Sequence, residues 1–169
     1  MVAPSCTTTY TSSTSVSSSG IATSCSGGSA TNYSFDTYTA GSITINKANQ
    51  AAISVTSTSG TVGSTLALTY TGGTGTGSIS YQKSNGSATC TLSGSNLSVS
   101  GAGTCLISVT KAADTNYNIK TSDTATVTFT TASLTISGGG NVTTNYGTSA
   151  TSATFTQSGG SGSITWSIK

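Results

Sequence analysis

The sequence predicts an all-β protein built of small β-sandwiches, and three observations support this prediction. Thr and Ser occupy 71 of the 169 positions, and Thr, Val, Ile and Tyr dominate the residues other than Gly, a composition that favours half-buried, pleated strands. Gly occurs in pairs and triplets between Thr-rich runs, where tight turns belong. Apolar residues alternate with a period of two and no segment has helical periodicity, which excludes a parallel α/β sheet.

Residues 47–131 contain seven short segments with this alternation. Each segment would place apolar side chains on one face and Ser or Thr on the other, as in a small immunoglobulin-like β-sandwich. The fourth and fifth segments form a hairpin across Gly94-Ser95-Asn96. The seventeen inward residues, which make a thin core, are Ile53 and Val55; Leu66, Leu68 and Tyr70; Ile79 and Tyr81; Cys90 and Leu92; Leu97 and Val99; Cys105, Ile107 and Val109; Ala125, Val127 and Phe129.

The chain contains an internal repeat with a period of about 84 residues. Four segments of the sequence match a later segment at offsets of 84 to 87 positions. The matching segments are Ala30-Thr31-Asn32-Tyr33 with Asp114-Thr115-Asn116-Tyr117, Ile43-Thr44-Ile45 with Val127-Thr128-Phe129, Gly72-Gly73-Thr74-Gly75 with Gly159-Gly160-Ser161-Gly162, and Ser78-Ile79-Ser80-Tyr81 with Ser163-Ile164-Thr165-Trp166. The fold class predicted is therefore a tandem array of immunoglobulin-like sandwiches.

The predicted domain boundaries put the chain out of phase with this repeat. Residues 47–131 hold one complete sandwich, residues 1–46 the second half of a preceding one, and residues 132–169 the first half of a following one. The segment Asn46-Lys47-Ala48-Asn49 would be a short linker. Isolated halves would expose unpaired strand edges and half a core. We therefore expect head-to-tail completion of 132–169 by 1–46 of the next copy or adjacent repeat, in a tandem array or by strand complementation.

The four cysteines are expected to form structural disulfides. Cys90 and Cys105 fall on the inward register of strands that flank a hairpin, and Cys6 and Cys25 flank an equivalent hairpin at residues 14–20. Among three possible connectivities, Cys6–Cys25 with Cys90–Cys105 is the local one. A bridge closing a loop of about 15 residues adds about 3 kcal/mol in the chain-entropy picture. Such bridges predict an oxidising, extracytoplasmic setting, and the spacings lack the paired cysteines typical of zinc sites.

Ionisable residues are scarce, which excludes most catalytic chemistry. Charged residues make up 5% of the chain, as five Lys and three Asp, and there is no His, Glu or Arg. A Ser-His-Asp triad, a His general base, a paired Glu/Asp glycosidase site and a His-ligated metal cannot be built from these residues. A net charge of +2 from scattered Lys gives no basic patch for nucleic acid. No run of apolar residues is long enough to span a membrane. We expect no enzymatic activity, cofactor or metal.

Two groups of motifs resemble repeats of bacterial surface proteins. Asn32-Tyr33-Ser34-Phe35, followed by residues 39–48, resembles the closing signature of MBG-type repeats. Residues 53–131 resemble a related bacterial immunoglobulin-like repeat through the segments 58–63, 101–105 and 111–117. The resemblance implies a secreted or surface-displayed array of sandwiches that acts as a stalk, filament or adhesin. The chain departs from true immunoglobulin domains, because its paired cysteines lie too close in sequence for the usual bridge between sheets and no Trp separates them.

The expected function is that of a non-catalytic structural repeat unit of an extracellular bacterial filament, stalk or surface array. Many hydroxyls and little charge leave a neutral surface that suits packing among copies. The alternative is an adhesin module that binds a surface glycan, mucin or another surface, and this alternative rests on the family analogy.

Two recurring pairs, Asn32-Tyr33 and Asn116-Tyr117, are the candidate loop residues. We expect the Asn to make a local backbone turn and the Tyr to plug the end of the sandwich, with stacking on a ligand as the alternative. Asp114 and Asn116 offer two oxygens to a calcium ion, which takes six to eight, and Asp114 matches Ala30 in the other repeat, so no repeat-wide calcium site is expected. Further aromatic residues that could stack on sugars, although such residues usually face a core or a neighbouring domain, are Tyr10, Tyr38, Tyr70 and Trp166.

Overall fold

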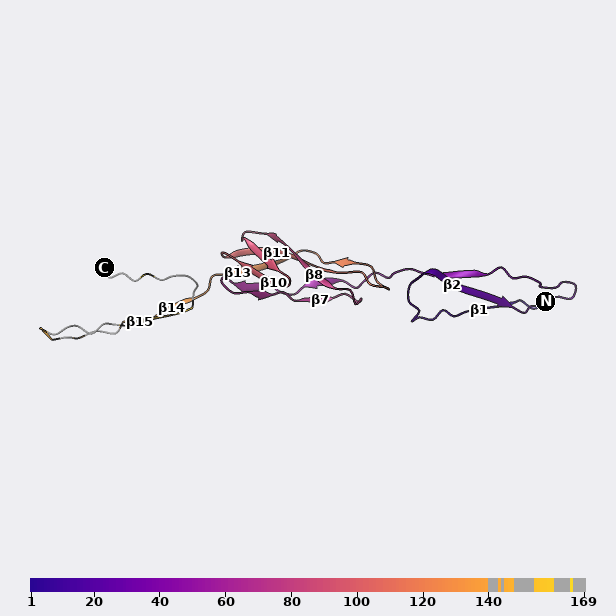
Figure 1. Cartoon of the computed structure of the whole chain (residues 1–169), viewed down its shortest axis with the longest axis horizontal. Helices are drawn as coiled ribbons and strands as arrows, with labels where there is room; N and C mark the ends of the chain where they lie inside the picture. The colour runs from indigo at the N-terminus through magenta and orange to yellow at the C-terminus, as the bar shows by residue number, and fades with distance from the viewer. Residues whose placement is uncertain (140–142, 144, 148–153, 160–164, 166–169) are drawn as a thin grey trace. The chain divides into compact units, whose positions relative to one another are not determined.

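The computed structural model describes residues 1–139, 143, 145–147, 154–159 and 165. These residues form strands and no helix (Figure 1), so the prediction of an all-β protein is confirmed. The strands are β1 (Ser5–Thr8), β2 (Ser17–Ser26), β3 (Gly41–Ile45), β4 (Ile53–Val55), β5 (Ser59–Thr61), β6 (Leu66–Ala67), β7 (Tyr70–Gly72), β8 (Ile79–Asn85), β9 (Cys90–Ser93), β10 (Asn96–Val99), β11 (Gly103–Lys111), β12 (Lys120–Thr121), β13 (Ala125–Thr130), β14 (Leu134–Gly138) and β15 (Phe155–Gly159).

The strands form several sheets, an arrangement consistent with β-sandwiches. Two sheets have three strands each, in the orders β1-β2-β3 and β6-β10-β9. A larger sheet has the order β12-β11-β13-β5, with β8 also paired to β11. The remaining described sheets are the pairs β4-β7 and β14-β15.

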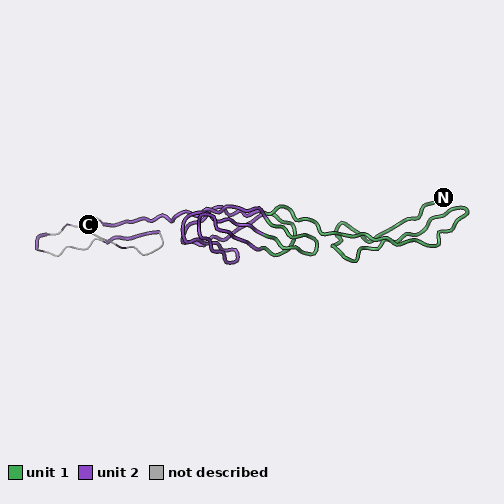
Figure 2. The backbone as a smooth tube through the Cα atoms, turned by 90° about the horizontal axis from the view of Figure 1, so that it is seen from above, with its two compact units in different colours: residues 1–53, 72–79, 110–121 green, residues 54–71, 80–109, 122–169 purple. Residues whose placement is uncertain are grey.

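The chain divides into two compact units (Figure 2). Unit 1 comprises residues 1–53, 72–79 and 110–121, and unit 2 comprises residues 54–71, 80–109 and 122–169. The expected complete sandwich, residues 47–131, contributes to both units. The proposed boundaries at 46/47 and 131/132 therefore stay a prediction.

The main hydrophobic core lies in unit 2, between the β6-β10-β9 sheet and the sheet that contains β11 and β13. Leu97, Cys105, Ile107 and Val127 are 0% exposed and Phe129 is 1% exposed. Partly buried side chains pack against this cluster, namely Val55, Val62, Leu66, Tyr81 and Leu92. Ten of the seventeen residues expected to face inward are buried. The expectation was wrong for Tyr70, which is 38% exposed.

The prediction of seven strands in residues 47–131 was too low, because ten are present. The expected single strand through Leu66, Leu68 and Tyr70 is divided into β6 and β7, which belong to different sheets. β5 was missed because Ser59-Gly60-Thr61 has no apolar residue to reveal alternation. Gly60 lies opposite Phe129 in a parallel pairing. A Cβ atom at this glycine would be 2.5 Å from the Phe129 ring, so the missing side chain makes room for the core.

The register of β2 on β3 recurs 84 residues later. Ile21 lies opposite Ile43. The residues 84 positions further along are Cys105 and Val127, and these lie opposite each other where β11 pairs with β13. The two strand pairs therefore place matching residues of the sequence repeat at matching positions of an antiparallel ladder.

A second correspondence links the β4-β7 pair to the β14-β15 pair. Gly72 and Gly159, which the sequence repeat matches, have positive φ angles of 87° and 82°. A side chain at Gly72 would collide with the carbonyl oxygen of Ala52, and one at Gly159 with the carbonyl oxygen of Ser133. Both positions need glycine for the same two reasons, a left-handed backbone and a close approach to the preceding strand.

The two disulfides join Cys6 to Cys25 and Cys90 to Cys105, and they differ in kind. Cys6 lies directly opposite Cys25 on the adjacent strands β1 and β2, with a Cα–Cα distance of 4.0 Å. Cys90 lies on β9 and Cys105 on β11, which belong to different sheets, and their Cα atoms are 6.0 Å apart. The expectation of an equivalent hairpin at residues 14–20 was wrong, because no strand is present between β1 and β2.

The sequence separation of 15 residues also proved sufficient for a bridge between sheets. The β9-β10 hairpin occupies the interval and returns the chain toward Gly103, where β11 begins in the second sheet. The bridge thus connects the two layers around the core, although the short spacing had predicted that it would not join two sheets.

Mild reduction is expected to open Cys6–Cys25 before Cys90–Cys105. Cys6 is exposed, whereas Cys90 and Cys105 are 3% and 0% exposed and lie in the core, so a thiolate reductant reaches the first bridge without unfolding of the protein. Alkylation at increasing times followed by mass spectrometry measures the order. Simultaneous labelling of all four cysteines under native conditions would contradict the difference in accessibility.

Candidate functional site

The three-stranded sheet β1-β2-β3 has one apolar face, whose isoleucine side chains are less buried than their counterparts in unit 2. Ile21, Ile43 and Ile45 are only partly buried, and none of residues 1–46 is buried. The residues that match these isoleucines 84 positions later are Cys105, Val127 and Phe129, which are at most 1% exposed. The same strand pairing therefore faces a packed core in one part of the chain and a partly open surface in the other.

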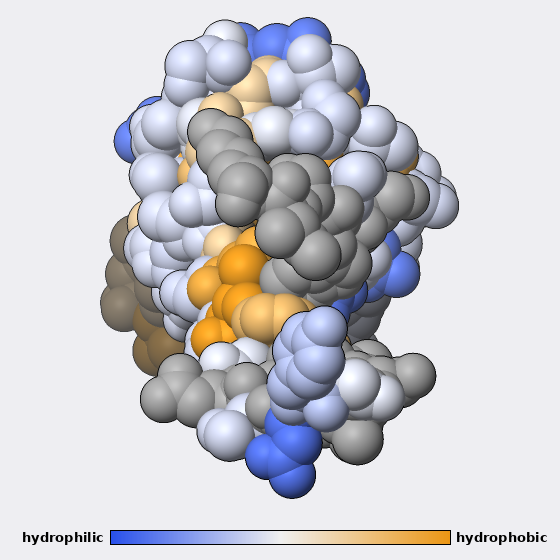
Figure 3. Space-filling view, turned by 90° about the vertical axis from the view of Figure 1, so that its left-hand side faces the viewer, coloured by the Kyte–Doolittle hydropathy of each residue, from blue (hydrophilic) through white to orange (hydrophobic). Residues whose placement is uncertain are grey.

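The β14-β15 pair also exposes its apolar residues. Leu134 is 47% exposed and Ile136 is 55% exposed. Phe155 lies opposite Gly138, on the same face as these two side chains, and is 50% exposed. Figure 3 shows apolar residues, coloured orange, open to solvent among more hydrophilic surface on the face turned to the viewer. We call Leu134, Ile136 and Phe155 the β14-β15 apolar face.

The outer edge of β3 is a further unpaired feature among the described residues, because the sheet order ends at this strand. The matching strand β13 is paired on both sides. At its outer edge the Thr128 N–H donates to the Thr58 carbonyl oxygen at 2.9 Å. Thr44 is the counterpart of Thr128 84 positions earlier, so its N–H is expected to point to the open edge. An edge of this kind can accept an added strand.

The segment Asn46-Lys47-Ala48-Asn49, expected to be a short linker, is held by backbone hydrogen bonds. Within unit 1, Ala48 forms a parallel bridge with Tyr117. Its N–H donates to the Asn116 carbonyl oxygen, and its carbonyl oxygen accepts from the Asn118 N–H, both at 2.9 Å. The segment is thus tied to the loop between β11 and β12 by backbone hydrogen bonds, which restrict its bending.

The sequence had suggested that Asn116 makes the turn in that loop. In the structure the turn is made by Asp114. The Asp114 carboxylate accepts hydrogen bonds from the backbone N–H groups of Asn116 at 2.9 Å and Tyr117 at 2.8 Å, and from Thr76 at 2.6 Å. The bond from Thr76 is the main cause that lowers the pKa of Asp114. Both carboxylate oxygens are occupied by these donors, which explains the local turn without a metal ion.

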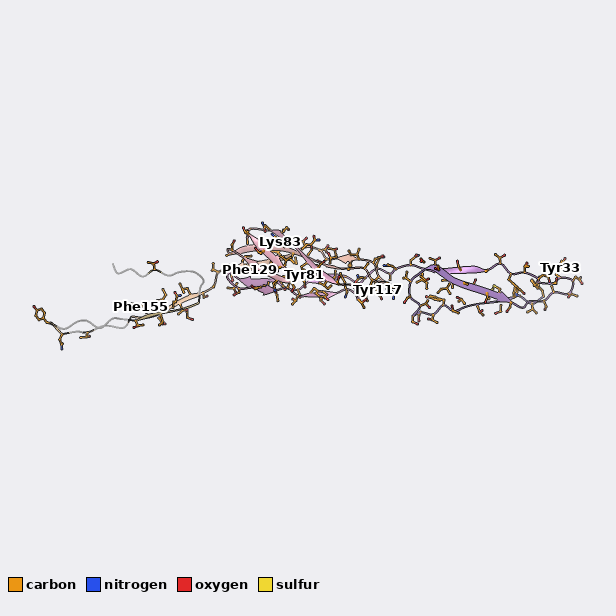
Figure 4. The ribbon with its side chains drawn as sticks, viewed as in Figure 1. Tyr33, Tyr81, Lys83, Tyr117, Phe129 and Phe155 are labelled. Carbon is orange, nitrogen blue, oxygen red and sulfur yellow. A yellow bond between two sulfur atoms is a disulfide. The ribbon has the colours of Figure 1, made fainter. Side chains whose placement is uncertain are left out.

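Asn116 has a different role from its expected one. Its Oδ1 accepts a hydrogen bond from the Val16 N–H at 2.9 Å, between residues 100 positions apart. Tyr117 is half-buried, in agreement with a packing role, and Figure 4 labels it in this loop. Tyr33, its counterpart in the sequence repeat, is 80% exposed and plugs no core, so the expected equivalence of the two Asn-Tyr pairs was wrong.

The other candidate aromatic residues fall into three situations. Tyr10 and Tyr70 are 47% and 38% exposed. Tyr38 is half-buried and donates its hydroxyl hydrogen to the Gly27 carbonyl oxygen. Trp166 lies outside the described residues. The exposed aromatic residues therefore do not face a core, as alternation had suggested for Tyr70.

Gln50 is a buried polar residue that sequence reasoning missed. It is 6% exposed. Its Nε2 donates to the carbonyl oxygens of Ala112 at 3.1 Å and Asn118 at 2.8 Å, and its Oε1 accepts from the Gly75 N–H at 3.3 Å. One amide thereby holds two loops of unit 1 together. A lone Gln in a polar stretch carries no sequence signal, because its partners are all backbone groups distant in sequence.

A hollow of about 270 Å³ lies beside these contacts in unit 1. Its lining is neutral and combines hydroxyl, amide and phenol groups with small apolar side chains. The lining includes Ser12, Thr14, Val16, Asn46, Asn116 and Tyr117.

Two further observations concern the described part of the chain. It contains no group of three or more His, Cys, Asp or Glu side chains that could hold a metal ion. Within those residues there is also no helix with the length and apolar character needed to cross a bilayer.

Asp114 is expected to make the stability of unit 1 depend on acid pH. Because its folded-state pKa is lowered, the carboxylate stabilises the fold above the ordinary carboxyl pKa of about 3.9, and this contribution is lost as pH falls below that value. The melting temperature of Asp114→Asn should lie below that of the wild type at pH 6, and the gap should close on acidification. Asp123→Asn is the control, because no hydrogen bond to its carboxylate is found in the described residues. A gap independent of pH would contradict the assignment.

Comparison of the chain with protein-family models, with curated proteins and with solved structures found no match. The resemblance to MBG-type and bacterial immunoglobulin-like repeats stays a prediction from the motifs. Function is therefore inferred from the strand pairing, burial and chemistry described above.

Proposed function

We propose that the chain is a non-catalytic structural repeat unit of an extracellular filament, stalk or surface array. In this proposal the chain comprises immunoglobulin-like sandwich repeats of about 84 residues, and residues 1–46 and 132–169 are completed by neighbouring repeats. One observation carries the proposal. The β2-β3 register recurs in β11-β13, yet Cys105, Val127 and Phe129 are fully buried whereas their counterparts Ile21, Ile43 and Ile45 are only partly buried by the described residues.

The arrangement of strands supports the repeat. β2 and β3 correspond to β11 and β13 in sequence position and in pairing, and Gly72 and Gly159 share an unusual backbone requirement. Repeat proteins bury such incomplete faces by stacking against neighbours. A chain with one complete sandwich between two half-sandwiches is thus suited to a continuous assembly.

Disulfides and surface composition support the extracellular setting. Two disulfides and the lack of free cysteines among the described residues are typical of proteins made in an oxidising compartment. A chain that is 5% charged presents a nearly neutral, hydroxyl-rich surface. Copies of such a surface neither repel nor strongly attract one another through charge.

The tied segment around Ala48 supports a mechanical role. Backbone bonds to Asn116 and Asn118, together with the hydrogen bonds of the Gln50 amide, restrain the chain at the segment expected to be a short linker. A stalk or filament transmits force best when the junctions between its domains resist bending. This restraint is consistent with a chain that serves as a long, stiff structural element.

Antibody labelling of the native source, read by electron microscopy, tests the proposal. Label on fibres or a surface layer outside the cell is the expected result, with denaturing electrophoresis distinguishing a very long tandem polypeptide from separate subunits. Label confined to the cell interior would overturn the proposal. Loss of cell-surface fibres on deletion of the coding sequence would support it independently.

The neutral hollow favours a second candidate function, that of an adhesin module for a surface glycan. Tyr117 offers an aromatic ring and Asn116 an amide beside several hydroxyls, which are groups that bind sugars through stacking and hydrogen bonds. A glycan array probed with the full chain tests this function. Binding lost in Tyr117→Ala and kept in Tyr33→Ala would establish a site at the hollow, and silence across the array would leave the structural role.

A further inference from the structure

Resting on the proposed function, we infer that a second copy of the chain covers the apolar face of β1-β2-β3 with its β14-β15 apolar face. The proposal names both surfaces of a head-to-tail contact. The acceptor comprises Ile21, Ile43 and Ile45 of one copy. The donor comprises Leu134 and Ile136 of the other, and Phe155 lies on the same face.

The acceptor is apolar on one side only. Along β2 and β3 the partly buried residues Ile21, Ile43 and Ile45 alternate with exposed ones such as Ser24 and Thr44. A strand pair with this alternation packs its apolar side against another layer. The hydroxyl-rich side faces water, so the position of the missing layer is determined.

The complete part of the chain shows what kind of segment covers such a face. The cluster that contains Cys105, Val127 and Phe129 is packed by Val55 and Leu66, among other residues. Val55 belongs to β4, which precedes β11 and β13 in the chain. The layer missing over β2 and β3 would therefore come from a segment similar to β4 and the strands that follow it.

β14 is that segment by backbone position. A side chain at Gly72 would come close to the Ile53 Cα, and a side chain at Gly159 would come close to the Leu134 Cα. Leu134 therefore occupies the place of Ile53, and Ile136 the place of Val55. Ile53 is 5% exposed whereas Leu134 is 47% exposed, so the donor residues carry the same side-chain chemistry in an uncovered state.

Charge favours a second copy over an ionic partner. None of the strands β1, β2, β3, β14 and β15 contains a charged residue. The two faces can approach without like-charge repulsion and without leaving a charge buried and unpaired. Contact between them buries apolar area on both sides, which is the driving force for association.

The donor and the acceptor lie on different parts of the chain, which defines the geometry of assembly. A contact between unlike surfaces is heterologous, so each copy keeps one free donor and one free acceptor after pairing. Such contacts extend into open chains unless the rotation closes a ring. The association is therefore expected to progress beyond a dimer as concentration rises.

Sedimentation velocity of the full chain over a wide range of concentration tests the inference. The wild-type mass should rise with concentration. Ile136→Asp, which puts a charge in the donor, and Ile43→Asp, which puts one in the acceptor, should each weaken self-association at least tenfold. Thr135→Asp is the matched control, because it adds the same charge to the opposite side of β14 and should associate as the wild type does.

An equimolar mixture of Ile136→Asp and Ile43→Asp tests most directly whether the donor face pairs with the acceptor face. Ile136→Asp keeps an intact acceptor and Ile43→Asp an intact donor, so together they should form a dimer of twice the chain mass and stop there. Circular dichroism and an intact Cys6–Cys25 bridge verify folding, and Ile43→Ala replaces Ile43→Asp if that variant does not fold.

Two outcomes would overturn the inference. One is a wild-type chain that stays monomeric at every concentration, and the other is equal weakening by Thr135→Asp and Ile136→Asp. Neither outcome decides the proposed function, since a covalent tandem array also builds a fibre. That function depends on the labelling of native material, so the failure of one proposal is distinguishable from the failure of the other.

Discussion

Replacing Leu97 with alanine is expected to lower the free energy of unfolding by about 2–5 kcal/mol. Leu97 lies at the centre of β10, is 0% exposed and belongs to the cluster with Cys105 and Phe129. Truncation removes buried methyl groups and leaves a cavity in a thin core whose strands have little freedom to collapse. Urea unfolding monitored by circular dichroism in dilute solution measures the loss.

Leu134→Ala is the matched control for this prediction. It removes the same atoms from a leucine that is 47% exposed, so the stability of the monomer should change by less than about 1 kcal/mol. Equal losses for the two variants would contradict the placement of the core. A selective effect of Leu134→Ala on self-association, with monomer stability kept, would agree with its place in the donor face.

Removing the Cys90–Cys105 bridge is expected to have the second largest effect. The double variant Cys90→Ala/Cys105→Ala should lose about 3 kcal/mol, because the loop of 15 residues is released in the unfolded chain. The bridge also joins the two layers around the core, so its loss opens the contact between the β9-β10 hairpin and β11. The change is measured by chemical denaturation with matched m-values.

The Cys6→Ala/Cys25→Ala variant distinguishes the effect of the Cys6–Cys25 bridge on stability from that of the Cys90–Cys105 bridge. Cys6 and Cys25 staple adjacent strands of a sheet that has no buried residue, so their loss should leave the unfolding of unit 2 unchanged while it loosens β1 from β2. Hydrogen exchange resolves the two regions. An equal effect of both double variants on unit 2 would contradict the separate roles assigned to them.

The strands of unit 2 were predictable because alternation is strong there. Cys105, Ile107 and Val109 are all 0% exposed, and β11 has the expected register. Parallel pairing of β5 was not predictable, since Gly60 contributes no side chain and its partner Phe129 is almost 70 positions away. The break between β6 and β7 was also not predictable, because the alternation of apolar and polar residues continues through Leu68 and Tyr70 although the chain changes sheet there.

The candidate site was predictable in outline and not in detail. The phase of the repeat predicted incomplete halves, which stays a prediction; the structure shows that Ile136 is exposed and that no residue of 1–46 is buried. The hydrogen bonds of Asn116 and Gln50 could not be predicted from the sequence. The partners of both side chains are backbone groups of distant residues, and backbone groups carry no sequence signal. Local turn preference favoured Asn116, whereas Asp114, with its two acceptor oxygens, makes the turn.

Amide hydrogen exchange at Thr44 is the decisive experiment for the proposal that a neighbouring repeat completes residues 1–46. We expect rapid exchange of the Thr44 amide in the dilute chain and slow exchange in the assembled state, with the Thr128 amide slow in both because it already donates to Thr58. Rapid exchange of the Thr44 amide in the assembled state, or equal protection of both amides in the dilute chain, would contradict it.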